Sequence, residues 1–245
     1  MTSSDRLPPE ETPPVISLVV ERTSMATQYN ALHFDRLGHT TVRIETEDGT
    51  VCYIDPWSES LEKEPHDGDI ILITHDDPDH YDPEGIAAVA SNDAVVGAFQ
   101  LVDTDELSAE VIALPHEGTT AIGEITVKSI PAYNDPDGPH TDEEGNPFHA
   151  EGDGIGLLLT IGNDTVFFAG DTDFLEHHKS EQADVFIPPI GGHYTMDRYE
   201  AAEFARTLEP SLVLPVHYDT FEAIETDSAA FKEELEAEDI EVILF

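Results

Sequence analysis

The chain has 245 residues, of which 39% are hydrophobic, enough for a buried core, and no apolar run approaches the ~20 residues that span a bilayer. Ten Lys and Arg stand against 53 Asp and Glu, and the resulting formal net charge of −43 argues against a nucleic-acid partner. The acidic residues are spread along the whole chain, which favours a surface adapted to a high-salt cytoplasm over an acidic tail.

Residues 1–24 differ from the rest of the chain. Several prolines there lie among Ser, Thr and acidic residues, a composition typical of a flexible tail. This segment lacks the basic-then-apolar order of a secretory signal, so we expect a cytoplasmic protein with no membrane segment. Met25 is an alternative start, and residues 25–245 are expected to form one domain.

Strands dominate the first part of that domain. A β-meander is predicted over Leu32–His39, Thr41–Glu45 and Val51–Ile54, with Cys52 as a core residue. The short apolar run Asp69–Thr74 predicts a buried strand. A helix is expected from Asp82 to about Ala90, because proline suits the first helical turn and acidic residues favour that end.

Further strand signals follow, and then a long loop. The strands are predicted at 94–99, 111–114, 121–122 and 125–132. Residues 134–154 are rich in Asp, Gly and Pro and predict a loop, and a loop of this length inside a compact domain more often serves a function.

The last third alternates strands with helices. A β-hairpin is expected over 155–169, followed by a short polar helix, and later helices are predicted at 197–207 and 227–237. The remaining strands are predicted at 185–187, 212–216 and 241–245. Two sheets covered by outer helices fit this order, so the predicted class is α+β.

The densest group of chemically active residues follows the strand at 69–74, where two histidines and three aspartates occupy residues 75–80. Residues 75, 77 and 79 alternate in an extended segment and can point the same way, while His80 can reach a second position. Asp171 and His217 also follow buried strands, and the long loop adds His140 and His149. Donors converging from several strand ends are what divalent ions need, so we predict a site for one or two ions.

An acidic loop with histidines is, taken alone, equally consistent with solvated surface. The motifs around it favour the metal site. Thr74–His80, Gly170–Thr172 and Pro215–Tyr218, in this order, resemble the metallo-β-lactamase superfamily. Further motifs make residues 32–245 similar to the metal-dependent hydrolase branch related to L-ascorbate-6-phosphate lactonases; they lie at 37–39, 53–56, 131–134 and 189–196.

The resemblance implies a four-layer αβ/βα sandwich, two mixed β-sheets flanked by helices, with a binuclear centre. The implied ligands of one ion are His75, Asp77 and a histidine of the 134–154 loop. Those of the other ion are Asp79, His80 and His217, and Asp171 bridges the two.

Two positions depart from the family pattern. Asp77 stands where a histidine is usual, and Asn134 stands near the usual third histidine. His149 is preferred as the replacement because it lies nearer the following strand, and His140 is the alternative. The expected ion is zinc, although the carboxylate of Asp77 shifts preference toward Mn or Fe.

The implied chemistry is hydrolysis of a small ester, lactone or phosphoester by a metal-bound hydroxide. Asp79 is expected to orient the nucleophile, and His193 to donate a proton or hydrogen bond to the substrate. His39 is expected to be a structural hydrogen-bonding residue. The alternatives are a nuclease-type phosphodiesterase of the same superfamily and a non-catalytic protein that binds one ion and a metabolite. A small-molecule substrate is the expected partner, and homo-oligomerisation stays open.

Overall fold

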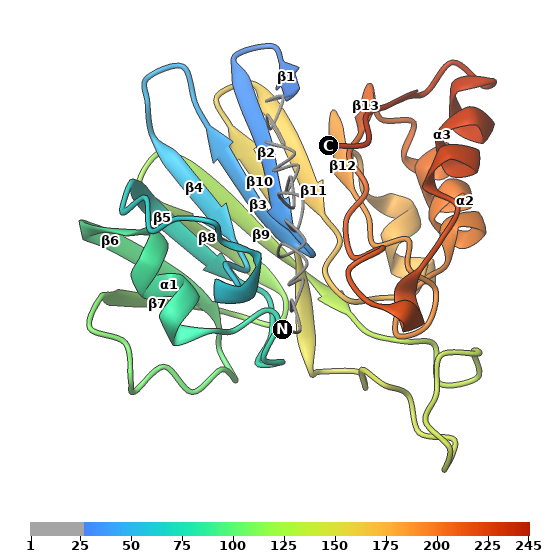
Figure 1. Ribbon diagram of the computed structural model, residues 1–245, viewed down its shortest axis with the longest axis horizontal. Helices are drawn as coiled ribbons and strands as arrows, with labels where there is room; N and C mark the ends of the chain where they lie inside the picture. Colours follow the sequence, from blue (N-terminus) through green and yellow to red (C-terminus); the bar gives the residue numbers. More distant parts are fainter. Residues whose placement is uncertain (1–26) are drawn as a thin grey trace, which may run out of the picture.

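Two seven-stranded sheets form the centre of the computed structural model, which describes residues 27–245. The predicted tail, 1–24, and the alternative start at Met25 lie outside the described residues. Figure 1 shows α1 beside the first sheet and the α2–α3 pair beside the second, at opposite sides of the molecule. The predicted α+β, four-layer arrangement is confirmed.

The first sheet follows the chain in simple order. Its strands are β1 (Thr27–Tyr29), β2 (Leu32–Gly38), β3 (Thr41–Glu45), β4 (Val51–Ile54), β5 (Gly68–Ile73), β6 (Ala90–Phe99) and β7 (Glu110–Leu114). Pairing is antiparallel from β1 to β4 and parallel from β4 to β7. The β2–β3–β4 meander was predicted, and Cys52 in β4 is buried as expected.

The second sheet repeats this plan. Its strands are β8 (Gly118–Ile122), β9 (Ile125–Ala132), β10 (Gly154–Ile161), β11 (Asp164–Phe168), β12 (Val185–Ile187), β13 (Leu212–Val213) and β14 (Glu241–Val242). Pairing is antiparallel from β8 to β11 and parallel from β11 to β14. In each sheet the parallel strands therefore bring several carboxyl ends to one edge.

Each α-helix begins directly after an aspartate that caps its N-terminus. They are α1 (Pro83–Val89), α2 (Arg198–Leu208) and α3 (Ser228–Glu236), with 3-10 turns η1 (Ser58–Ser60), η2 (Glu176–Ser180) and η3 (Glu222–Ile224). The side chains of Asp82, Asp197 and Asp227 each accept a hydrogen bond from a backbone N–H in the first helical turn. The predicted short polar helix is the 3-10 turn η2.

Two hydrophobic clusters hold the layers together. One includes Phe34, Leu72 and Phe168 between the sheets, and the other packs the second sheet against α2 and α3. Phe167 and Phe168 are neighbours in β11 but belong to different clusters, because successive side chains of a strand point to opposite faces.

The predicted strand at 212–216 is wrong beyond Val213. Pro215 has no N–H to donate to a ladder, and regular pairing resumes only as an isolated bridge between Pro189 and Val216. The predicted terminal strand at 241–245 likewise ends at Val242. Residues 214–216 still run beside the segment after β12, because Leu214 N donates to the Phe186 carbonyl and Val216 N donates to the Pro188 carbonyl, both at 2.9 Å. This extension brings His217 to the edge where the other parallel strands end.

Candidate metal centre

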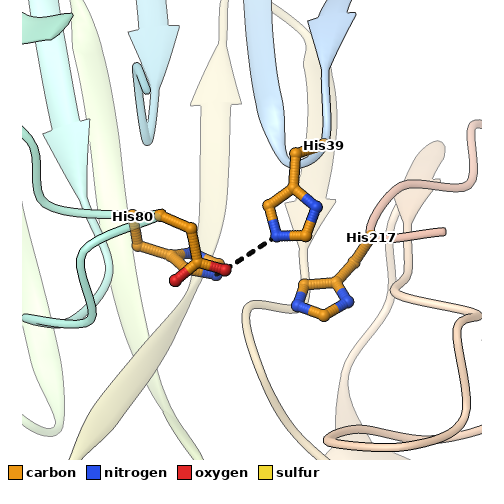
Figure 2. Close-up of side chains that lie close together, drawn as sticks. His39, His80 and His217 are labelled. Carbon is orange, nitrogen blue, oxygen red and sulfur yellow. Dashed lines mark hydrogen bonds and ion pairs between the residues drawn. The ribbon is translucent and has the colours of Figure 1, made fainter. Parts of the chain in front are cut away.

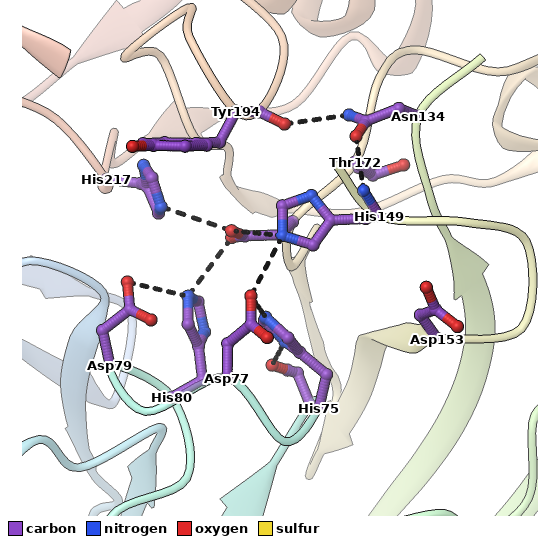
Figure 3. A network of polar contacts seen from close by, with 12 residues as sticks. His75, Asp77, Asp79, His80, Asn134, His149, Asp153, Thr172, Tyr194 and His217 are labelled. Atoms are coloured by element: carbon purple, nitrogen blue, oxygen red, sulfur yellow. Dashed lines mark hydrogen bonds and ion pairs between the residues drawn. The ribbon is translucent and has the colours of Figure 1, made fainter. Parts of the chain in front are cut away.

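The loops that follow β5, β9, β11 and β13 meet at the carboxyl edges of the two sheets (Figure 3). The β5 loop carries four of the predicted ligands, and the second sheet carries three. The seven are His75, Asp77, Asp79, His80, His149, Asp171 and His217. The four histidines and Asp171 are buried, whereas the Asp77 side chain is half exposed.

One group of donors consists of His75, Asp77 and His149, whose candidate ligand atoms all lie within 4.8 Å of one another. The Asp77 Oδ2 atom is 3.6 Å from His75 Nε2 and 3.4 Å from His149 Nε2. His149 Nε2 is also 3.4 Å from Asp171 Oδ2. The loop histidine that the sequence favoured thus lies beside the first two predicted ligands.

A second group surrounds His80 and His217, with Asp79 and His39 beside them. His80 Nε2 lies 3.8 Å from Asp79 Oδ2 and 3.4 Å from Asp171 Oδ1, and His217 Nε2 lies 3.2 Å from Asp171 Oδ2. Asp171 therefore faces donors of both groups, the position that a bridging carboxylate would occupy.

The donor set fits divalent ions. The nitrogen-to-oxygen separations above are longer than good hydrogen bonds but close to the roughly 3.4 Å edge of a tetrahedron with bonds of about 2.1 Å. His75 Nε2, His80 Nε2 and Asp171 Oδ1 are buried without a hydrogen-bond partner. Each such atom costs about 1–3 kcal/mol, a cost that ion coordination would remove.

The carboxylates are held in the ionised form that a metal ligand requires. Burial raises the pKa of Asp171, but His217 and His80 outweigh it and hold the pKa well below the usual range. The nearby rings of His149 and His75 lower the pKa of Asp77. Burial alone would raise the pKa of Asp79, but the hydrogen bond from His39, with other nearby charges, lowers this pKa to about 2.

His39 is a hydrogen-bonding residue, as the sequence led us to expect. Its Nε2 donates to Asp79 Oδ2 at 2.8 Å, the dashed line from His39 in Figure 2. Its Nδ1 lies 3.1 Å from Thr220 Oγ1. Burial lowers the pKa of His39 to about 4, so the ring is neutral near pH 7. The His39 carbonyl accepts a hydrogen bond from the His217 backbone N–H at 3.1 Å. The β2–β3 turn therefore fixes both Asp79 and the His217 backbone.

Asp55 lies in the 53–56 motif, but the sequence analysis gave it no role in the site. It is fully buried after β4 and accepts hydrogen bonds from Thr74 N (2.9 Å), Thr74 Oγ1 (2.6 Å) and His80 Nδ1 (2.8 Å). The bond to Nδ1 leaves His80 Nε2 as the atom available to an ion. A polar residue directly after a buried strand was the signal that identified Asp171, and Asp55 carries the same signal.

Asn134 explains why His149, and not His140, reaches the first group. The Asn134 side-chain oxygen accepts a hydrogen bond from the backbone N–H of His149 at 2.8 Å. The backbone N–H of Asn134 donates to the His149 carbonyl at 2.9 Å. The Asn134 amide nitrogen donates to Asp173 and to the Tyr194 carbonyl. His140 instead pairs with Asp173 at 2.7 Å, in a separate group with Glu200.

His193 lies outside the described groups of candidate ligands. It sits on an exposed turn, where its ring centroid is 5.3 Å from that of Phe148 and 4.5 Å from that of Tyr194. The structure therefore places it among aromatic side chains, and its role as a proton or hydrogen-bond donor to substrate stays a prediction.

Comparisons with known proteins agree on a family. A family model described as the beta-lactamase superfamily domain matches residues 34–217. A UPF0173 metal-dependent hydrolase of Salinibacter ruber is 31% identical over 207 residues, covering 80% of this chain and 88% of that one. Another, of Thermofilum pendens, is 32% identical over 216 residues, covering 82% and 90%.

Solved structures show the same fold. Igni18, a metallo hydrolase of Ignicoccus hospitalis, matches with a TM-score of 0.71 and 25% identity, covering 87% of this chain and 94% of that one. A protein of Parabacteroides distasonis matches with a TM-score of 0.73 and 28% identity, covering 86% of this chain and 91% of that one.

Within residues 27–245, every helix is too short or too polar to cross a membrane.

Proposed function

The chain belongs to the UPF0173 metal-dependent hydrolase family of the metallo-β-lactamase superfamily, and from this membership we propose that it cleaves a small ester, lactone or phosphoester at two divalent ions. The observation that carries the proposal is Asp171, a buried carboxylate that faces histidines of both donor groups. In this assignment His75, Asp77 and His149 hold one ion, Asp79, His80 and His217 hold the other, and Asp171 bridges.

Two bound divalent ions would lower the pKa of a water molecule and polarise the carbonyl or phosphoryl oxygen that it attacks. The protein contributes orientation. Asp79, fixed by His39, would accept a hydrogen bond from the attacking water, and His193 would donate to the substrate from its exposed turn. Zinc suits four histidines, and the three carboxylates also admit Mn or Fe.

The test is metal stoichiometry measured together with turnover. We expect about two ions per wild-type chain and hydrolysis of at least one member of a panel of esters, lactones and phosphoesters, lost on chelation. His149→Ala is expected to lower the stoichiometry to about one. His140→Ala is the matched control, because that histidine pairs with Asp173 and is expected to leave both ions bound.

Two results would contradict the proposal. Unchanged turnover in a His80→Ala, His217→Ala double variant would show that the reaction does not use this centre. One ion per chain, with no turnover of any panel member, would favour the non-catalytic metabolite-binding alternative.

A further inference from the structure

Aromatic side chains from separate loops lie beside the donor groups. Here we call them the aromatic rim: Trp57, Phe148, Tyr194 and Phe221, with the rings of His39 and His193 between them. Neighbouring ring centroids around this series are 4.5–6.4 Å apart. These spacings fall within or near the range at which aromatic rings interact.

The rim is continuous with the candidate metal centre. The ring of His39, which holds Asp79, lies 5.4 Å from Trp57 and 5.7 Å from Phe221. Phe148 directly precedes His149, and Figure 3 shows the Tyr194 side chain reaching toward the His217 side of the centre. A molecule that contacts the ions would therefore also meet these rings.

The rim residues are open to solvent although they are large and apolar. Phe221 is 40% exposed and Trp57, Phe148 and Tyr194 are half-buried, while the aromatic residues of the two cores are buried. Partly exposed aromatic rings that gather around a polar site from four different loops are typical of ligand recognition.

Most basic side chains that could bind a phosphoryl group already contact other groups of the protein. Within the described part of the chain, the arginines and lysines other than Lys63 each meet a carboxylate or a backbone carbonyl. Arg36 lies nearest the centre, but its guanidinium donates to the carbonyls of His39 and Tyr218 and stacks on the Tyr218 ring at 4.1 Å. Lys63 lies exposed between Glu62 and Glu64. The rim thus offers aromatic rings, but no arginine that could bind a phosphate through two parallel hydrogen bonds.

We propose that the substrate is an uncharged carboxylic ester or lactone that carries an aromatic ring, and that Tyr194 and Phe221 bind this ring. The inference rests on the proposed hydrolytic function and narrows it. At low ionic strength the acidic surface adds to the argument, because a net charge of −43 then repels phosphate monoesters and other anions.

The experiment compares two six-membered lactones that both release an alkoxide, 3-isochromanone with a fused benzene ring and δ-valerolactone without one. We expect kcat/KM to favour 3-isochromanone by about 4- to 100-fold, since two ring contacts contribute a factor of about two to ten each. Tyr194→Ala and Phe221→Ala are each expected to lower that preference about threefold or more, mainly through KM. Tyr199→Ala is the matched control, because this exposed tyrosine lies on α2 and contacts Arg198.

Trp57 supplies a readout that does not depend on turnover, because it is the single tryptophan of the chain and lies in the rim. Titration of the two-ion protein with 2-tetralone, a benzo-fused ketone that cannot be hydrolysed, is expected to quench its fluorescence saturably. Cyclohexanone, which lacks the aromatic ring, is expected to have little effect. Both rim variants are expected to retain two ions per chain and to bind 2-tetralone more weakly.

The outcomes separate this inference from the proposed function. Quenching by 2-tetralone without turnover of any panel member would contradict hydrolysis and leave the aromatic site standing. Equal turnover of the two lactones, or faster turnover of 4-nitrophenyl phosphate than of 4-nitrophenyl acetate, would overturn the aromatic ester or lactone assignment. Rim variants that keep the wild-type lactone preference would also overturn it.

Discussion

At the scale of single residues, side chains that carry no predicted ligand atom hold the ligands in place. Asp55 fixes the ring of His80, Asn134 holds the backbone of His149, and His39 holds Asp79. Each of the three is buried and makes at least two hydrogen bonds. Ligands restrained in this way lose little conformational entropy when an ion binds.

Asp55→Asn is expected to weaken metal binding about 10- to 100-fold, the usual effect of losing a group that orients a ligand. The amide can no longer accept all three hydrogen bonds from Thr74 and His80, because one of its two terminal atoms is a donor. Competition with a chromogenic chelator measures the affinity. Asp67→Asn is a matched control on the same sheet, where Asp67 bonds Tyr53 and Arg43. Equal affinities in the two variants would refute the role of Asp55.

A buried histidine far from the predicted ligands predicts acid sensitivity. His178 stacks on Phe204, accepts from Leu175 N and lies 3.2 Å from the Pro131 carbonyl. Burial, with His177 nearby, lowers the pKa of His178 from 6.5 to about 3. Between these values the unfolded chain binds the proton and the folded chain does not, so stability falls as pH drops below 6.5.

By pH 5 this histidine alone accounts for a loss of about 2 kcal/mol in the free energy of unfolding. Glutamine does not titrate in this range. Between pH 7 and pH 5 the His178→Gln variant is therefore expected to lose less free energy of unfolding than the wild type, by about this amount. Urea unfolding at constant ionic strength measures both proteins. An identical pH dependence would show that His178 does not carry the effect.

Sequence reasoning located most candidate ligands because they follow short apolar runs that predict buried strands, while His149 came from the long loop. It passed over Asp55 because an Asp-Pro pair after a strand also suits an exposed turn. Asp55 is held inside by Thr74, which directly follows the neighbouring parallel strand β5 and lies 19 residues away in the chain. His193 illustrates the same limit, since its surroundings depend on Phe148 from another loop.

At the scale of elements, α1 illustrates how a helix can be predicted without its packing. The sequence specified its start through Asp82 and Pro83, and α1 begins there. Its close contact with the segment after β4 could not be read from periodicity. That contact depends on Gly85, where an added Cβ would lie 2.1 Å from the Pro56 carbonyl oxygen.

Gly85→Ala is expected to destabilise the protein, against the usual gain of about 1 kcal/mol for alanine over glycine inside a helix. The clash with backbone forces α1 away from Pro56, and overpacking of this kind costs about 1–3 kcal/mol. Ala87→Gly on the exposed face of α1 is the control, with an expected cost of about 1 kcal/mol. If Gly85→Ala raised the urea midpoint, the close packing would be disproved.

At the scale of the whole molecule, the charge of −43 predicts dependence on salt. We propose that the acidic surface suits a high-salt cytoplasm, because at 1 M ionic strength the Debye length shrinks to about 3 Å and self-repulsion is screened. Between 0.1 M and 2 M KCl, Tm is expected to rise by about 5 °C or more, which corresponds to about 2 kcal/mol for a chain of this length.

A variant with Glu106, Glu117 and Glu124 changed to Gln tests this explanation. All three glutamates are exposed, and neutralising them is expected to raise Tm at low salt and to reduce the salt dependence. Scanning calorimetry measures both effects. A flat salt response in the wild type would remove the basis for the high-salt proposal.

The division of the chain into two consecutive sheets has a consequence for the order of folding. Residues 27–114 build one sheet and residues 118–242 the other, so each can pair its strands mostly between neighbours in sequence. The β5 loop supplies His75 to His80, while His149, Asp171 and His217 arrive with the second sheet. In the proposed assignment neither half completes the ligand set of an ion alone. Metal uptake during refolding is therefore expected to report the docking of the two halves.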